Sequence, residues 1–182
     1  MAHAVEALYA KDRNPIISLM AEHSLRSFAQ SLPAIVASPK NESARSEALY
    51  AAWLAGTCLG AVGMSLHHKL CHVLGGTFNL PHAETHTIIL PHATAYNSQA
   101  EPEVMNTIAK TIGAENASTG LYDFTGRLGA KRSLRELGMP EDGIEKATLL
   151  AIQNPYWNPR RLESDAIREL ICRAWAGEPP AE

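Results

Sequence analysis

The sequence predicts an all-α fold in a single domain. Apolar residues recur at intervals of three and four over most of the 182-residue chain, which is the period of a helix with one buried face. Alternating runs of β-branched residues, the mark of strands, are missing, and the one strand-like patch, Ile88-Ile89-Leu90, is short and flanked by helical signals. A hydrophobic content of 46% at this length is enough for one packed core.

The first half of the chain contains four expected helices, which cover 3–12, 16–35, 43–60 and 61–77. Asn14-Pro15 interrupts the first helical pattern, and Pro15 suits the first turn of the helix that follows. The turn-rich segment 38–43 separates the second helix from an alanine-rich third. The fourth helix carries three histidines, and Gly75-Gly76 predicts its end.

The second half contains five expected helices, which cover 82–96, 101–112, 117–130, 141–153 and 163–176. Pro155 and Pro159 bracket an aromatic connector, residues 154–159, which we expect to be extended. Gly177 follows the last helix and suits its end.

Charge and cysteine content exclude several classes of protein. The formal net charge is −3 and the basic residues are scattered, so neither nucleic acid nor an anionic membrane is an expected partner. Three widely spaced cysteines without a CxxC pair do not form a disulfide framework and indicate a reducing compartment. The N-terminal residues do not resemble a signal peptide, and no stretch of 18 apolar residues could span a membrane. We therefore expect a cytoplasmic protein.

Histidines form the most informative cluster. Six of the eight lie between residues 67 and 92, and two pairs have i, i+4 spacing, His68 with His72 and His82 with His86. Residues four apart share a helix face, so two facing helices could gather four imidazoles around one centre. Imidazole suits zinc, iron, nickel and copper, and a catalytic centre needs about three protein ligands and one open position. Chance spacing, with histidines bonded to backbone carbonyls, is the competing interpretation of the residues alone.

The segment from His67 to His86 resembles the signature of iron-containing alcohol dehydrogenases, in which a helix with HxxxH ends at glycine and Pro-His opens the next helix. In that family the first histidine of HxxxH and the histidine after proline are metal ligands, fourteen residues apart, as His68 and His82 are here. His3 matches a further family ligand. The resemblance implies a divalent iron or zinc ion on these three residues. His72 matches the histidine that faces nicotinamide and substrate, which implies a catalytic and cofactor-binding role.

Four segments resemble the maleylacetate reductase branch of that family: residues 67–72, 79–86, 90–92 and 154–160. The resemblance implies the helical C-terminal domain of the dehydroquinate synthase-like, iron alcohol dehydrogenase fold, with residues 1–182 as one metal- and substrate-binding domain. His86 stands where the alcohol dehydrogenases usually carry Asn, so His86 and His67 are further catalytic candidates. Lys69 and His86 are candidates for holding a substrate carboxylate, although Lys69 could equally face solvent.

The family's other half has no counterpart in this sequence. Residues 1–182 contain neither GxGxxG nor another glycine-rich turn after a strand, so we expect the nucleotide-binding α/β domain to be absent and this chain alone to have little reductase activity. For the chain paired with that domain, the resemblance implies NAD(P)H-dependent reduction of maleylacetate, a small dicarboxylate, to 3-oxoadipate in aromatic degradation. A homo-oligomer is expected. A stand-alone metal- or dicarboxylate-binding module, or a folded remnant without redox activity, are the alternatives.

Overall fold

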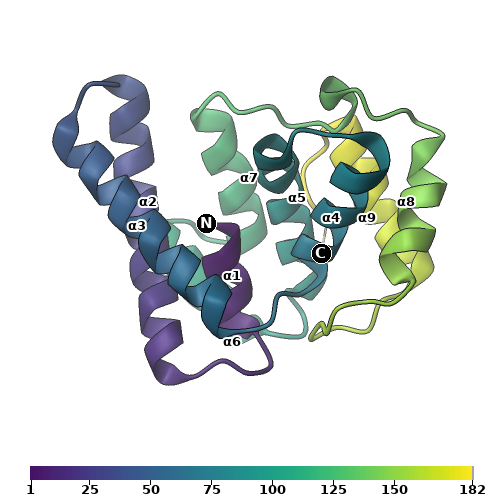
Figure 1. Ribbon diagram of the computed structural model, residues 1–182, viewed down its shortest axis with the longest axis horizontal. Helices are drawn as coiled ribbons and strands as arrows, with labels where there is room; N and C mark the ends of the chain where they lie inside the picture. Colours follow the sequence, from purple (N-terminus) through teal and green to yellow (C-terminus); the bar gives the residue numbers. More distant parts are fainter. Residues whose placement is uncertain (182) are drawn as a thin grey trace.

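The computed structural model describes residues 1–181, and within them it contains helices and connectors without a strand, which confirms the all-α prediction (Figure 1). The α-helices are α1 (Ala2–Tyr9), α2 (Pro15–Ala37), α3 (Glu42–Ala61), α4 (Leu66–Phe78), α5 (His82–Asn97), α6 (Pro102–Ile112), α7 (Ala117–Arg127), α8 (Gly143–Ile152) and α9 (Ser164–Ala176). A short 3₁₀ helix, η1 (Arg135–Leu137), precedes α8.

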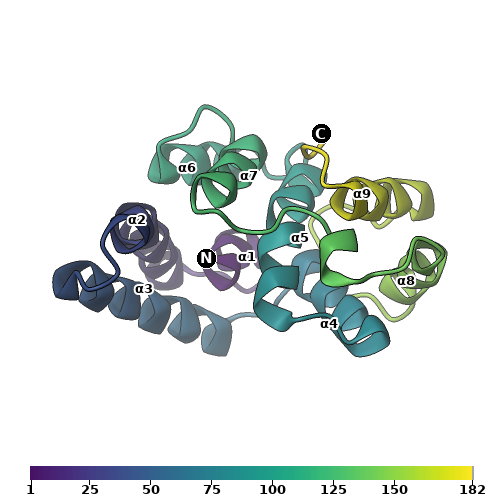
Figure 2. The same ribbon diagram turned by 90° about the horizontal axis from the view of Figure 1, so that it is seen from above.

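Two hydrophobic cores lie side by side in the molecule. The first joins α1, α2, α6 and α7 with the end of α3, and the second joins α4, α8 and α9 with segment 134–139. Helix α5 belongs to both, because Leu90 packs in the first core while Ile88 and Ile89 pack in the second. Figures 1 and 2 show α1 near the centre, with the long α2–α3 hairpin on one side and α4, α8 and α9 on the other. Helices α1, α4 and α5 therefore meet where the cores adjoin.

Asparagine side chains fix the beginnings of three helices. The Asn14 side chain accepts hydrogen bonds from the backbone N–H groups of Ile16 and Ile17, and Asn41 accepts one from Ala44. Asn116 accepts one in the same way at the start of α7. The first N–H groups of a helix have no intrahelical acceptor, so such caps determine where a helix begins. The interruption predicted at Asn14-Pro15 is therefore an N-cap.

The prediction that Gly75-Gly76 ends the histidine helix is wrong. Both glycines lie inside α4, which continues to Phe78. The helix ends at Asn79, whose φ of 53° places it in the left-handed region that terminates helices. Asparagine tolerates this conformation because its short side chain bonds locally to the backbone. The residue that ends the helix is therefore Asn79 rather than Gly75-Gly76, although the last helical residue lies only one beyond the predicted range of 61–77.

The predicted boundary at residues 60–61 places the fourth helix directly after the third, but a sharp turn separates α3 from α4 in the structure. Residues 62–65 are not helical, and the axes of the two helices are bent by 97°. Within residues 1–181, no individual helix is long and apolar enough to cross a membrane, and α3 with α4 meets such a criterion only as this bent pair. The turn directs the N-terminus of α4 onto α1, where the histidines gather.

Candidate metal and active site

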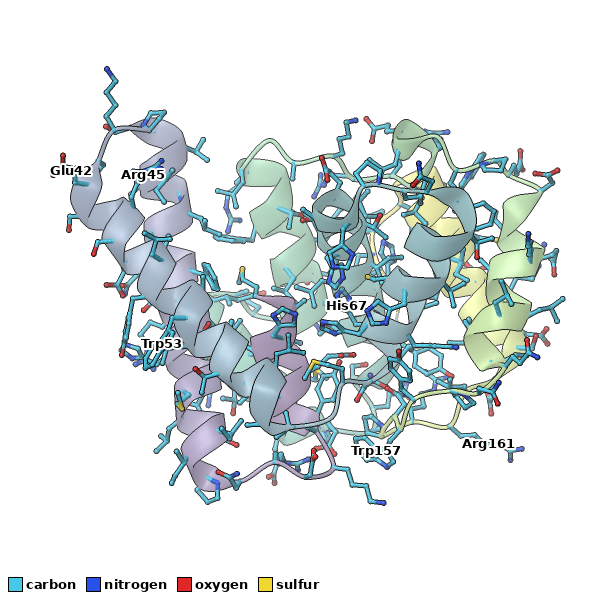
Figure 3. The ribbon with its side chains drawn as sticks, viewed as in Figure 1. Glu42, Arg45, Trp53, His67, Trp157 and Arg161 are labelled. Atoms are coloured by element: carbon cyan, nitrogen blue, oxygen red, sulfur yellow. The ribbon has the colours of Figure 1, made fainter. Side chains whose placement is uncertain are left out.

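The structure brings the six predicted histidines of the site together from three helices: His3 of α1, His67, His68 and His72 of α4, and His82 and His86 of α5. The ring of His68 lies 4.8 Å from that of His3 and 5.0 Å from that of His86, between centroids. The rings of His82 and His86 are 4.2 Å apart. Figure 3 shows His67 in the middle of the molecule with imidazoles around it.

A buried glutamate organises this cluster. Glu6 is fully buried on α1, and its Oε1 accepts the backbone N–H of His67 at 2.8 Å. Its Oε2 accepts the backbone N–H of Ser65 at 2.8 Å and lies 2.6 Å from His68 Nδ1. The carboxylate thus accepts hydrogen bonds from backbone N–H groups at the N-terminus of α4, which have no acceptor within the helix. The helix dipole also favours negative charge at this position.

Glu6 also fixes the tautomer of His68. A carboxylate only accepts hydrogen bonds, so Nδ1 of His68 carries a proton, and in the neutral ring Nε2 keeps a free lone pair. That Nε2 is buried without a hydrogen-bond partner in the part of the chain that the structure describes. A metal-ligating histidine commonly donates its other N–H to a carboxylate in this way. The arrangement of His68 fits a metal ligand, with His3 stacked on its ring.

Sequence reasoning did not identify Glu6. A signal existed, because Glu6 is the one acidic residue of helix α1, and buried carboxylates are rare without a partner. Its partners, however, are 59 to 62 residues away along the chain. Only the packing of α1 against α4 shows what the carboxylate contacts.

A second group of donor atoms lies beside the first. His67 Nε2, Cys71 Sγ and His86 Nδ1 are within 4.8 Å of one another. The two nitrogens are 3.0 Å apart, and Sγ lies 3.7 Å from His67 Nε2. Burial raises the pKa of the Cys71 thiol well above its ordinary value, which opposes the thiolate that a metal would bind. The hydrogen bond between the two imidazoles already satisfies these nitrogens, and His3, His68 and His82 remain the ligands predicted from the family resemblance.

Four imidazoles of the cluster, those of His3, His67, His72 and His86, have lowered pKa values that favour their neutral form. Burial first and the neighbouring His68 ring second lower the pKa of His3 to about 4 and that of His86 to about 3. The pKa of His67 is well below its ordinary value and that of His72 is lowered, for the same two reasons. At neutral pH these rings present lone pairs and single N–H groups, which is the form that binds metal and exchanges hydrogen bonds.

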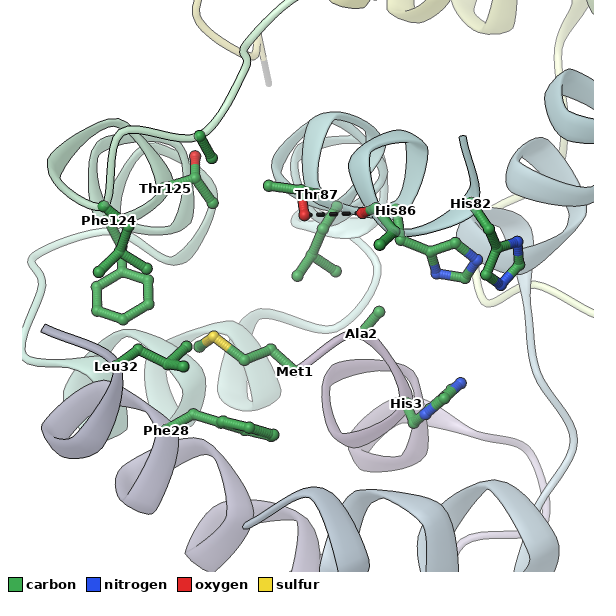
Figure 4. Close-up of a pocket in the computed structure, with 14 residues that line it drawn as sticks. Met1, Ala2, His3, Phe28, Leu32, His82, His86, Thr87, Phe124 and Thr125 are labelled. Atoms are coloured by element: carbon green, nitrogen blue, oxygen red, sulfur yellow. Dashed lines mark hydrogen bonds between the residues drawn. The ribbon is translucent and has the colours of Figure 1, made fainter. Parts of the chain in front are cut away.

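A cavity of about 410 Å³ opens beside the cluster (Figure 4). His3, His82 and His86 line one side of it, and Phe28 and Phe124 line the other. The volume is within the range of small-molecule sites, about 300–1,000 Å³. No side chain of Lys, Arg, Asp or Glu lines it among the described residues, so hydrogen bonds and apolar contacts dominate this wall.

Lys69, predicted to hold a substrate carboxylate, lies elsewhere. Its Nζ is 5.8 Å from the centre of the Tyr156 ring, beside His72. Arg160, the other basic residue of the resembling segments, donates to the backbone carbonyl of Tyr96 at 3.1 Å and packs on that ring. Arg160 therefore has a structural role, whereas Lys69 stays close to the cluster without lining the cavity.

Comparison with known proteins identifies the family of the chain. A model of the Fe-containing alcohol dehydrogenase family, C-terminal, matches residues 1–175. The chain belongs to the iron-containing alcohol dehydrogenase family. This membership confirms the resemblance seen in the histidine segment, and the helical fold is that of the family's C-terminal domain.

Relatives in this family include maleylacetate reductases. Those of Sphingobium indicum and Burkholderia cepacia are 54% and 55% identical to the chain over 99% and 100% of its length. The crystal structure of maleylacetate reductase from Agrobacterium tumefaciens superposes with a TM-score of 0.95 at 53% identity, over 98% of this chain and 51% of that one. A 1,3-propanediol oxidoreductase, 30% identical, superposes over 96% of this chain and 49% of its own with a TM-score of 0.89. The chain spans about half the length (51%) of the curated relatives it matches.

Proposed function

We propose that the chain is the helical half of an NAD(P)H-dependent maleylacetate reductase, a cytoplasmic oxidoreductase that forms 3-oxoadipate when paired with a nucleotide-binding α/β domain. The observation that carries this proposal is the set of imidazoles at the junction of α1, α4 and α5, with Glu6 holding His68. Identity of 54–55% to maleylacetate reductases over the whole chain supports the substrate class. Residues 1–182 then form one metal- and substrate-binding domain.

The reaction makes two demands on the site. Hydride from NAD(P)H adds to the alkene carbon farther from the ketone, and the electron pair of the double bond moves to the ketone oxygen as an enolate. A proton must then reach the carbon next to the ketone. The site therefore has to stabilise negative charge on one oxygen and deliver one proton.

The first demand fits a metal ion. His3, His68 and His82 would hold a divalent iron or zinc ion, because imidazole nitrogens suit these metals and the buried Nε2 of His68 has no partner among the described residues. When bound, such an ion supplies a Lewis acid for the negative charge that develops on the substrate. Glu6 increases the basicity of the His68 ring through the hydrogen bond to Nδ1.

The remaining roles belong to His72, His86, His67 and Lys69. His72 is exposed at the edge of the cluster, where it would face nicotinamide and relay the proton. His86 lines the cavity, and its Nδ1 is hydrogen-bonded to His67 Nε2, so Nε2 is the atom of His86 that would form a hydrogen bond to substrate. Lys69 would attract a substrate carboxylate as a point charge.

Metal analysis tests the binding part of the proposal. We expect protein purified without chelator to contain near-stoichiometric iron or zinc, which His68→Ala and His82→Ala both lose. His23→Ala, an exposed histidine of α2 outside the cluster, is the matched control. Metal that persists in both cluster variants would refute the assigned ligands.

Complementation tests the reductase part. We expect the chain, mixed with the nucleotide-binding half of the Burkholderia cepacia relative, to restore maleylacetate-dependent oxidation of NAD(P)H. Bound metal without any such oxidation would replace the proposal by a stand-alone metal-binding module. Neither metal nor oxidation would indicate a folded remnant, and size measurement of the mixture would test the expected homo-oligomer.

A further inference from the structure

The connector between α8 and α9 is fastened to the end of α5. Asn97 and Asn158 exchange hydrogen bonds through their side-chain amides, with N···O distances of 3.0 and 2.7 Å. Asn158 also donates to the carbonyl of Arg160 at 2.7 Å. Asn97 is fully buried, so a reciprocal amide pair there holds the connector in one position.

Tyr96 provides a second attachment for the same connector. Its hydroxyl donates to the carbonyl of Arg161 at 2.7 Å and accepts the backbone N–H of Glu163 at 3.1 Å. The guanidinium of Arg160 lies 4.2 Å from the centre of the Tyr96 ring. The segment therefore has defined contacts on the C-terminal side of its aromatic residues, although it is not part of a helix.

These attachments place Tyr156 against the exposed end of the histidine cluster. The hydroxyl of Tyr156 lies 3.0 Å from Nδ1 of His72, and the two rings meet edge to face at 6.0 Å. The ammonium of Lys69, one turn before His72 on α4, lies over the Tyr156 ring, 5.8 Å from its centre. The neighbouring Trp157 lies at the edge of the molecule, away from His67 (Figure 3).

We propose that Tyr156 is a positioning residue that holds His72 in the tautomer with its proton on Nε2, by donating its hydroxyl hydrogen to Nδ1. This inference rests on the proposed function for its catalytic consequence. A phenol is the stronger donor and an imidazole nitrogen the stronger acceptor, so the hydrogen bond runs from Tyr156 to His72. The lowered pKa of His72, caused first by burial, keeps the ring neutral and able to accept.

The two histidines of the HxxxH motif are thereby set to opposite tautomers. Glu6 accepts a hydrogen bond from the Nδ1–H group of His68, so Nε2 of the neutral ring has its lone pair available for a metal. Tyr156 occupies Nδ1 of His72, which leaves an N–H at Nε2 that has no hydrogen bond within the described residues. One turn of α4 therefore presents an electron-pair donor and a proton donor at neighbouring positions.

The proton balance also assigns Tyr156 a part in resupply. As the Nε2–H bond of His72 breaks and a C–H bond forms on the enolate carbon, Nδ1 takes the hydroxyl proton of Tyr156. Nε2 of His72, which is exposed, then takes a proton from solvent while Nδ1 returns the hydroxyl proton to Tyr156, so the starting tautomer is restored. The route supplies the one proton that the reduction consumes, and His72 stays neutral throughout.

Nitrogen NMR of the isolated chain, with the histidines labelled with ¹⁵N, tests the tautomer directly. We expect Nε2 of His72 to be protonated and Nδ1 to be an acceptor, with His72→Gln identifying the resonances. Tyr156→Phe, which removes only the hydroxyl, should shift the ratio of the two tautomers toward Nδ1–H by roughly two- to tenfold, the equivalent of one neutral hydrogen bond. Trp157→Phe, in the same connector, should leave the ratio unchanged.

A protonated Nδ1 in the unmodified chain, or an unchanged ratio in Tyr156→Phe, would overturn the inference. The amide spectrum of each variant reports whether the chain is folded, independently of the tautomer. With the nucleotide-binding half added, Tyr156→Phe should lower kcat about tenfold and leave KM within about twofold, since the proton step is affected and binding is not. If the mixture has no activity at all, the proposed function fails while the NMR result still decides the role of Tyr156.

Discussion

Replacing Glu6 should affect stability and metal binding together, because one buried carboxylate serves both. Glu6 accepts two backbone N–H groups at the start of α4 and the Nδ1 proton of His68. Glu6→Ala leaves three buried donors without an acceptor. Glu6→Gln keeps the shape of the side chain, but the amide NH₂ group replaces one carboxylate oxygen and therefore faces another hydrogen-bond donor.

The magnitude follows from the hydrogen bonds that each substitution removes. Breaking a buried charged network by removing one partner costs about 3–5 kcal/mol, which we expect for Glu6→Ala. For Glu6→Gln we expect about 1–3 kcal/mol, the cost of one buried donor left unsatisfied. The glutamine amide can also donate to Nδ1 of His68, which moves the proton to Nε2 and blocks the predicted metal ligand.

Urea unfolding followed by circular dichroism measures the first effect. With a slope of about 2 kcal/mol/M, the midpoint of Glu6→Ala should fall by about 1.5–2.5 M. A chelator must be present, since metal bound only to the folded state would add its own stabilisation. Glu103→Gln, an exposed acid in the first turn of α6, is the control and should change stability by less than about 1 kcal/mol.

Metal analysis of the same proteins measures the second effect. We expect Glu6→Gln to lose most of its metal while remaining folded in buffer. A Glu6→Gln protein with unchanged metal content and an unchanged midpoint would refute the role of Glu6 as the organiser of the cluster. Loss of stability with full metal retention would refute only the link to the His68 tautomer.

Three further predictions concern pH, packing and the connector. Burial lowers the pKa of His92 to about 4, so the ring is neutral in the folded chain at pH values where the unfolded chain, with the ordinary pKa of 6.5, already binds a proton. The contribution of this group to the free energy of unfolding is therefore complete above pH 6.5 and falls by about 3 kcal/mol toward pH 4. His92→Gln should lose this part of the pH dependence in urea titrations at successive pH values. The Cβ added by Gly76→Ala meets nothing within 4 Å, so this substitution should raise stability by about 0.5–1 kcal/mol in thermal melts. The Cβ added by Gly120→Ala would lie 2.4 Å from that of Ala114, so this substitution should lower stability by about 1–3 kcal/mol. Asn158→Ala should speed proteolysis of the connector at least several-fold, and an unchanged cleavage rate would show that the amide pair with Asn97 does not hold it.

Local sequence signals were sufficient for most of the helices and for the histidines. The i, i+4 pairs define faces of α4 and α5, so the gathering of their imidazoles follows from helix geometry alone. The end of α4 was placed wrongly because Gly75-Gly76 has an intrinsic tendency to end a helix, which burial of Leu74 and the packing of α4 on α5 and α8 overrides. Asn79 followed by Pro81 was the better signal for the end.

Interactions between distant segments were the part that could not be read from the residues. Glu6 and His68 are 62 residues apart, and His72 and Tyr156 are 84 apart. No periodicity connects such pairs, since each depends on how two helices or a connector pack in three dimensions. The roles of His68 and His72 are nevertheless set by these partners, through the ring nitrogen that each one occupies.

The pairing of Glu6 with the start of α4 has a consequence for synthesis on the ribosome. Helix α1 has eight residues and is too short to be stable alone in water. The Glu6 carboxylate of this helix bonds to Ser65 and His67, which are 59 and 61 residues downstream. These two residues emerge roughly 3–12 s later at a synthesis rate of about 5–20 residues per second. During that interval Glu6 is hydrated and the α4 imidazoles do not yet exist in the nascent chain. The metal-binding arrangement can therefore assemble only after α1, α4 and α5 have all emerged, and until then His3 lacks the imidazoles of His68 and His82.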